Sequence, residues 1–240
     1  MSIEKLREAI ENAEKICVFT GAGISCPSGI PDFRSADGLY NEKDKSGYSP
    51  EEIISHTFFM RHTDMFYDFY KSKMMYPEAE PNEAHKYFAQ LEGKGKKVSV
   101  VTQNIDGLHS AAGSNDVYEL HGSVHRNFCV NCGEFYDSDY VYKSESIPEC
   151  EKCGGVVKPD VVLYEEGLDD DTVIGAFKAI KESDLLIIIG TSLAVYPAAS
   201  FVGYLKGDTI ALINKSSTPF DKKAHIVIYD DIINVVEHLV

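Results

Sequence analysis

Short apolar runs alternate along this chain with longer segments in which apolar residues recur at helical spacing. The short runs predict buried strands at residues 16–19, 98–101, 117–120, 156–163, 184–189, 210–213 and 225–229. The longer segments predict helices at residues 2–14, 50–56, 58–73 and 82–91, and further helices beginning near 169, 197 and 230. This alternation predicts an α/β fold with a doubly wound, Rossmann-like parallel sheet, which the strand at 156–163 is expected to rejoin.

Two insertions interrupt the alternation. One, at residues 36–80, is helical and carries an aromatic stripe that we interpret as core: Phe59, Phe66, Tyr67, Phe69 and Tyr70. The other, at residues 124–157, contains two pairs of cysteines. We expect both insertions to pack together as one small domain over the strand ends, while residues 1–35, 81–123 and 158–240 form the sheet domain.

A glycine turn follows the first strand at Gly21, Ala22 and Gly23. Glycines let backbone N–H groups approach a ligand closely, and residues 24–28 could open a helix whose positive end faces phosphate. The ordinary dinucleotide fingerprint requires a third glycine where this chain has Cys26, and an acidic residue later than Asp32. A tight turn without a ligand is therefore an alternative. However, Asp32, Phe33 and Arg34 place a carboxylate, an aromatic ring and a guanidinium directly after the turn, and a turn alone does not need them, which favours a ligand. The polar segment 35–47 that follows predicts a mobile loop.

Polar residues also follow three later strands. They occupy positions 102–109 after the second strand, position 121 after the third, and positions 190–192 after the strand at 184–189. Because the carboxyl ends of parallel strands share one edge of a sheet, these residues should meet the glycine turn there. A histidine is more often structural than catalytic, but His121 stands at a strand end beside a glycine, where acid–base chemistry is favoured.

The composition narrows the range of functions. The chain has 240 residues, 44% of them hydrophobic, and a formal net charge of −15. This charge argues against direct nucleic-acid binding and against an anionic membrane surface, and it favours a basic partner unless it serves only solubility. The first residues lack the apolar stretch of a signal peptide, and the longest apolar run, at 185–189, is too short to cross a bilayer, so we expect a cytoplasmic protein.

Four of the six cysteines form two Cys-x-x-Cys pairs, separated by seventeen residues and each followed by glycine. This spacing is typical of a zinc ribbon, with Cys129, Cys132, Cys150 and Cys153 as the ligands. Since the four cysteines fill a tetrahedral site, we expect the metal to be structural and not catalytic.

Five motifs together resemble the sirtuin family of NAD-dependent protein deacylases. They are segments 21–34, 102–106, 120–122 and 190–192 and the four cysteines, all in the family's order. The resemblance implies that NAD is consumed: the acyl group of an acyl-lysine passes to ADP-ribose, and nicotinamide, deacylated lysine and O-acyl-ADP-ribose leave. No hydride moves, which would explain the departures from the ordinary fingerprint.

The resemblance also implies roles for individual residues. His121 would be the general base, Asn104 would position the ribose and a water, and Asp106 would hold the nicotinamide amide. The residues implied to bind NAD are Gly21, Ala22, Gly23, Cys26, Asp32, Phe33, Arg34, Gln103, Asn104, Ile105, Asp106, His121, Gly190, Thr191, Ser192, Asn214, Lys215, Asp231 and Ile232. The segment implied to pair with a substrate peptide as an added strand is Val161, Val162, Leu163, Tyr164 and Glu165.

The chain departs from the family at one place, and at another it differs from one group of members. The family's usual Phe-Gly-Glu is Tyr164, Glu165 and Glu166 here, which predicts acyl-lysine substrates with basic flanking residues. Members that prefer acidic acyl groups carry Tyr-x-x-Arg, whereas this chain has Tyr67 and Tyr70, so we expect neutral acyl groups such as acetyl.

Two other functions are alternatives to protein deacetylation. A mono-ADP-ribosyltransferase could use the same site, because another nucleophile could capture the activated ribose. A non-enzymatic module that binds NAD and zinc is disfavoured, since both His121 and Asn104 are present.

Overall fold

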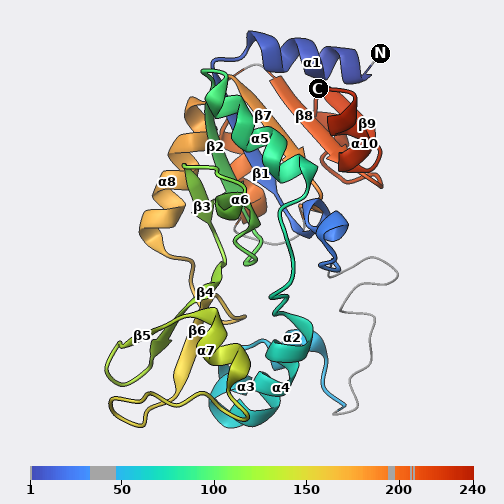
Figure 1. Cartoon of the computed structure of the whole chain (residues 1–240). Helices are drawn as coiled ribbons and strands as arrows, with labels where there is room; N and C mark the ends of the chain where they lie inside the picture. The colour runs from blue at the N-terminus through green and yellow to red at the C-terminus, as the bar shows by residue number, and fades with distance from the viewer. Residues whose placement is uncertain (1, 33–46, 194–197, 206, 208) are drawn as a thin grey trace.

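The structure is a computed structural model that describes residues 2–32, 47–193, 198–205, 207 and 209–240. Figure 1 shows an upper body, in which helices cover a sheet, and a smaller lower body. The predicted loop at 35–47 lies outside the described residues except for its last position, as do Phe33, Arg34 and the predicted helix start at Pro197. Among the described residues, no helix combines the length and apolar character needed to cross a membrane.

Six parallel strands form the sheet of the upper body. They are β1 (Lys15–Thr20), β2 (Lys97–Thr102), β3 (Val117–Glu119), β7 (Leu185–Ile189), β8 (Thr209–Asn214) and β9 (Ile226–Tyr229), in the order β3-β2-β1-β7-β8-β9. Chain order reverses between β1 and β7, and open parallel sheets bind ligands at such a reversal, beyond the carboxyl ends of the strands. The predicted Rossmann-like sheet is confirmed.

Helices cover both faces of this sheet (Figure 1). On one face, α1 (Ser2–Asn12), α5 (Glu83–Gly93) and α10 (Ile232–Glu237) share a core with alternate strand residues such as Val18. On the other, α8 (Asp170–Glu182) and α9 (Ala198–Phe201) share a core with the intervening residues such as Phe19. Since side chains alternate across a strand, one apolar run supplies both cores, which is why the strands are mostly apolar on both faces. A single-turn helix, α6 (Leu108–Ala111), follows the loop after β2.

The lower body joins the two insertions. The helical insertion contributes α2 (Pro50–Ile53), α3 (His56–Arg61) and α4 (Thr63–Lys73), and the cysteine-containing one contributes β4 (Gly122–Cys129), β5 (Phe135–Tyr136), α7 (Ser138–Lys143) and β6 (Val157–Val161). The three strands form an antiparallel sheet in the order β5-β4-β6. One hydrophobic core contains residues of both insertions, and the predicted aromatic stripe from Phe59 to Tyr70 is buried in it.

Three expectations were wrong. The run at 156–163 does not rejoin the large sheet: β6 pairs antiparallel with β4, and its alternating buried and half-buried residues suit a sheet covered on one face. The helix expected at 58–73 is interrupted at His62, whose φ of −138° and ψ of 53° are not helical. The turn after β1 continues as two 3₁₀ turns, Ala22–Ile24 and Cys26–Ser28, and not as an α-helix.

Candidate active site

A cavity of about 990 Å³ lies at the carboxyl ends of β1, β2 and β7. Its walls come from both bodies, for example Asn104 after β2 and Ile54 after α2. Most predicted site residues line this cavity: Gly21, Ala22, Gly23, Cys26, Asp32, Gln103, Asn104, Ile105, Asp106, His121, Val161, Val162, Leu163, Tyr164, Glu165, Gly190, Thr191, Ser192, Asn214, Lys215 and Ile232. Segments far apart in the sequence therefore meet in one concave site of the size that small-molecule ligands occupy.

The glycine turn is in backbone contact with the end of β7. The Gly21 N–H donates to the Ile189 carbonyl oxygen at 3.0 Å, and the Gly23 N–H donates to the Gly190 carbonyl oxygen at 2.9 Å. A Cβ added at Gly23 would lie 2.6 Å from the Gly190 Cα, and Gly190 itself has a φ of +61°. Only residues without a side chain allow this approach, and it leaves a bare backbone cradle that fits a pyrophosphate.

A chain of hydrogen bonds orients the polar residues after β2. The Asn104 side-chain nitrogen donates to Ser25 Oγ at 3.0 Å and to the Gly21 carbonyl oxygen at 3.3 Å. Ser25 Oγ in turn donates to Asp106 Oδ2 at 2.7 Å. Ser25 is fully buried and was not among the predicted site residues, although its hydroxyl follows the glycine turn directly. It connects the cradle to the loop that holds Asn104 and Asp106.

The imidazole of His121 is held in one tautomer. Its Nδ1 lies 2.9 Å from the carbonyl oxygen of Gln103, which can only accept, so Nδ1 carries the proton and Nε2 remains basic. Burial of the ring lowers the pKa of His121, against a smaller opposing effect of that backbone hydrogen bond. The ring is therefore neutral at neutral pH and can take up a proton, as a general base must.

The far end of the cavity lies beside β8. Gln103 Nε2 donates to Thr191 Oγ1 at 3.0 Å, and Asn214 Nδ2 donates to the Thr191 carbonyl oxygen at 2.8 Å. Lys215 pairs with Asp231 at 2.8 Å between Nζ and Oδ2. Asp231 does not line the cavity, but its ion-pair partner Lys215 does. These amides and hydroxyls suit the sugar hydroxyls of a nucleotide.

The segment after β6 forms another wall and is anchored to both bodies. The Val162 N–H donates to the His121 carbonyl oxygen at 3.0 Å, and Tyr164 pairs through its backbone with Ile54 and His56, both at 3.0 Å. Glu165 is exposed with a φ of +76°, a conformation that favours glycine. Its carboxylate accepts the Thr57 N–H at 2.9 Å, and hydrogen bonding to Thr57 lowers the pKa of Glu165.

The four predicted zinc cysteines come together. The ligand atoms of Cys129, Cys132, Cys150 and Cys153 all lie within 4.8 Å of one another. Measured Sγ–Sγ distances are 3.4 Å and 3.6 Å, close to the ~3.8 Å edge of a tetrahedron with Zn–S bonds of ~2.3 Å. The set therefore fits zinc. None of the four cysteines lines the cavity, which agrees with a structural metal.

Two buried histidines, His85 and His109, pack beside the glycine turn. His109 belongs to the polar segment 102–109 that was expected to meet this turn, whereas sequence reasoning missed His85. The rings of His85 and His109 lie 4.7 Å apart, and His109 Nε2 lies 3.1 Å from Thr20 Oγ1 at the end of β1. Asn82, next to His85 in space, donates from Nδ2 to the Ile24 carbonyl oxygen at 2.8 Å. Burial lowers the pKa of both histidines, His85 to about 4, so the pair is neutral and packs as part of the core.

A parallel sheet with a glycine cradle at its reversal point and a neutral, oriented imidazole beside it defines a dinucleotide-binding α/β enzyme with a separate zinc module. A sequence model described as "Sir2 family" matches residues 21–197. A Clostridium acetobutylicum protein named NAD-dependent protein deacetylase is 54% identical over 239 residues, covering 99% of this chain and 98% of that protein. One of the same name from Clostridium perfringens is 56% identical, covering 96% and 95%. The chain belongs to the Sir2 family.

Solved structures lead to the same family. A Sir2 structure with a deacetylated p53 peptide and 3′-O-acetyl-ADP-ribose superposes with a TM-score of 0.90 at 34% identity, covering 100% of this chain and 97% of the other. A Sir2 structure with a p53 peptide and NAD superposes with a TM-score of 0.87, also at 34% identity and the same coverage. Both the fold and the family predicted from the sequence are confirmed.

Proposed function

We propose that this chain is an NAD-dependent protein lysine deacetylase, which moves the acetyl group of acetyl-lysine to ADP-ribose and releases nicotinamide. The observation that carries the proposal is the placement of His121. Its basic Nε2 belongs to a cavity with a phosphate cradle on one side and a strand-like segment, 161–165, on the other. Full-length relatives named NAD-dependent protein deacetylase support the same activity.

NAD, when bound, supplies a ribose carbon that becomes reactive as nicotinamide leaves. We assign His121 as the general base that removes a proton from a ribose hydroxyl at Nε2. The hydrogen bonds of Asn104 and Asp106 with Ser25 hold both side chains ready to orient the ribose and the nicotinamide amide. Fixed orientation of this kind lowers a barrier because it is established before the reaction starts.

We assign the remaining cavity-lining residues to the rest of NAD. Gly21, Ala22, Gly23 and Gly190 would form the cradle of the pyrophosphate. The three glycines would give it room, since their N–H groups donate within the fold, and the Ala22 N–H would donate to it. Thr191, Ser192, Asn214, Lys215 and Ile232 would hold the adenosine end. Phe33 and Arg34 stay predictions for this site, and Asp231 would act through its ion pair with Lys215. The zinc ion would stabilise the small domain.

The test is direct. Purified protein is mixed with NAD and an acetyl-lysine peptide, and nicotinamide release and peptide mass are measured together. Deacetylation predicts one nicotinamide for each acetyl group lost. A protein or peptide that gains ADP-ribose would identify a mono-ADP-ribosyltransferase instead, and absence of both products would leave the non-enzymatic module. The cytoplasmic location expected from the sequence stays a prediction.

For the substrate, we propose neutral acyl groups on lysines with basic flanks. Lys158 and His56 pair with Glu166 at 3.2 Å and 2.8 Å, whereas the hydrogen bond of Glu165 comes from the uncharged Thr57 N–H. Hydrogen bonding to Thr57, with a smaller effect of His56 and Arg61, lowers the pKa of Glu165, so its carboxylate is charged at the rim of the cavity, where it attracts basic residues.

Matched acetyl-peptides with Lys/Arg or Asp/Glu flanks check this preference. We expect the basic-flank peptides to have the higher kcat/KM in the wild type, and the ratio to shrink towards one in Glu165→Gln and at high salt. Lys152→Gln, which removes an exposed charge of the zinc module, is the control and should leave the ratio unchanged. Equal rates on both peptides in the wild type would contradict the proposal.

A further inference from the structure

Strand β4, which begins directly after His121 and enters the small domain, has an irregular pairing with β6. In the β4–β6 ladder, Ser123 pairs with Asp160, but the next pair is Asn127 with Pro159. Three residues of β4, 124–126, therefore have no opposite residue on β6. Bulges of this kind redirect side chains and are common beside active sites. We call residues 124–126 the β4 bulge.

The β4 bulge contacts the loop that holds Asp106. The Val124 N–H donates to the Ile105 carbonyl oxygen at 3.0 Å, and His125 Nε2 donates to the Asp106 carbonyl oxygen, also at 3.0 Å. The His125 ring packs so closely against Gly107 that a Cβ there would lie 2.5 Å from it. The position of the bulge therefore sets the position of this loop.

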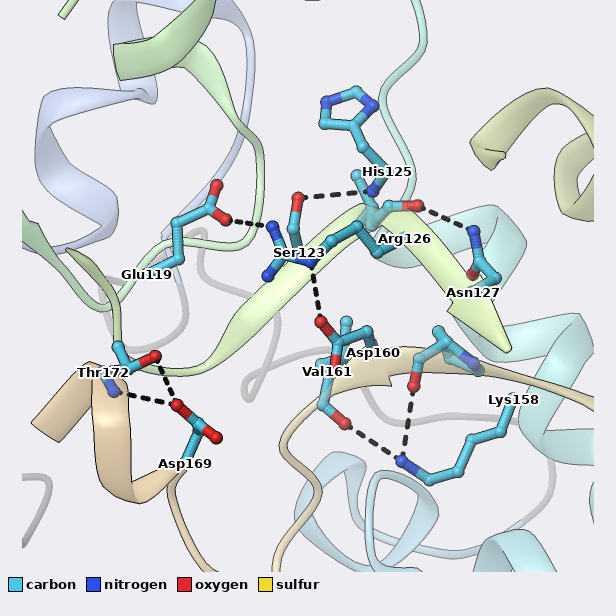
Figure 2. A network of polar contacts seen from close by, with 12 residues as sticks. Glu119, Ser123, His125, Arg126, Asn127, Lys158, Asp160, Val161, Asp169 and Thr172 are labelled. Carbon is cyan, nitrogen blue, oxygen red and sulfur yellow. Dashed lines mark hydrogen bonds and ion pairs between the residues drawn. The ribbon is translucent and has the colours of Figure 1, made fainter. Parts of the chain in front are cut away.

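The third residue of the β4 bulge, Arg126, contacts β3 and β6 and not the Asp106 loop. Figure 2 shows the guanidinium of Arg126 between two carboxylates, with Nε 2.8 Å from Asp160 Oδ2 and a terminal nitrogen 2.6 Å from Glu119 Oε2. Glu119 ends β3, two residues before His121, and Asp160 belongs to β6, directly before the predicted peptide segment. Arg126 thus connects the large sheet to the small one.

Strands β4 and β6, which carry Arg126 and Asp160, are packed tightly at their ends nearest His121. Gly122 has a φ of +76°, and a Cβ there would lie 1.9 Å from the Asp160 carbonyl oxygen. The next ladder contact is the hydrogen bond from Val162 to His121. A shift of β6 along β4 would therefore move the peptide segment relative to the imidazole.

We propose that Arg126 is a positioning residue, which fixes the distance between the general base His121 and the acyl-lysine held by segment 161–165. This rests on the proposed deacetylase function. Arg126, Glu119 and Asp160 do not line the cavity, so they act through the segments they hold and not on the ligands. The adenosine end lies on β7 and β8, which the Arg126 side chain does not contact. The contacts of the bulge with the Asp106 loop come from Val124 and His125, and these remain when only the Arg126 side chain is changed, so NAD affinity should change little.

If Arg126 only stabilised the fold, its loss would lower the melting temperature and would not act selectively on peptide use. The side chains of Arg126 and Asp160 are each 43% exposed, and an ion pair with that much solvent contributes little to folding. The Glu119 side chain is only 13% exposed, so loss of its charged partner should lower stability modestly. Positioning is more sensitive, because displacement of a reacting group by ~1 Å can reduce a rate by ~100-fold. The proposal therefore predicts a loss of peptide use that exceeds any loss of stability.

The variant Arg126→Gln tests this proposal, and Arg7→Gln is the matched control. Arg7 also has two hydrogen-bond partners, Glu4 and the His238 carbonyl, but it lies on α1 and does not line the cavity. We measure Kd for an acetyl-peptide by fluorescence anisotropy, Kd for NAD, kcat/KM and the melting temperature. For Arg126→Gln we expect at least a ~10-fold loss in kcat/KM for the peptide. NAD affinity should be close to that of Arg7→Gln, and the melting temperature should be no more than ~4 °C lower. Wild-type behaviour, or equal loss of peptide and NAD use, would overturn the proposal.

A double-mutant cycle with Asp160→Asn isolates the contact. If the ion pair positions the segment, the double variant should be no worse than the poorer single variant, whereas additive losses would overturn the proposal. Arg126→Lys should restore part of the peptide affinity, since lysine keeps the charge but cannot reach both carboxylates in a fixed geometry. If the wild type binds the peptide but does not turn it over, the proposed function fails, and the anisotropy series still tests the clamp.

Discussion

At the scale of single residues, the site depends on His121 being neutral and correctly oriented. We expect His121→Ala to lower turnover by roughly 10²- to 10⁴-fold, the usual contribution of a general base, while NAD affinity and zinc content stay unchanged. His238→Ala, an exposed histidine at the end of α10, is the control. Turnover within twofold of wild type in His121→Ala would contradict the assigned role.

The pH dependence of the same residue follows from its environment. A general base works when unprotonated, and burial lowers the pKa of His121 below the ordinary value of ~6.5. The rate on the acidic side should therefore hold down to a pH below ~6.5 and then fall as the ring takes up a proton. If kcat/KM already falls with decreasing pH at values clearly above ~6.5, another group controls the rate.

At the scale of elements, the turns after β1 and β7 form one unit. In Gly23→Ala the added methyl would meet Gly190 backbone atoms 2.6–3.1 Å away, so both turns must separate. We expect the free energy of unfolding to fall by about 1–3 kcal/mol and NAD affinity by at least ~10-fold. In the control Gly93→Ala, at the end of α5, the methyl meets no described atom within 4 Å. Chemical denaturation and calorimetric titration measure the two effects, and similar results for both variants would refute this view of the cradle.

At the scale of the whole molecule, the two bodies have separate cores and meet at the cavity. Removal of zinc by a chelator should loosen the small domain, because Cys129 and Cys150 belong to the core that also contains α2, α3 and α4. Hydrogen exchange should then rise at residues 50–73 and 122–161, with β1, β2 and β7 still protected, and added zinc should reverse the change. Uniform exchange over the chain would show that the bodies do not unfold separately.

The local pattern of the sequence was enough to predict most of the strands and helices, the glycine turn and the cysteine cluster, because hydrophobic period, glycine spacing and cysteine spacing act over short stretches of chain. Gly21 and Gly23 are an example: their spacing after a strand predicted a tight turn and made a ligand site one of two interpretations before any partner was known. The five motifs, present together and in the family's order, were also enough to identify the family from the sequence.

Only the tertiary structure decided which segments meet. The partner of a strand depends on contacts through space, so the run at 156–163 could not be placed beside β4 from its own residues. The tautomer of His121, the bridge through Ser25 and the clamp of Arg126 depend on a single backbone or side-chain atom supplied by a distant segment. Local pattern specifies what each segment can form, whereas distances of about 3 Å between remote groups exist only after both cores have packed.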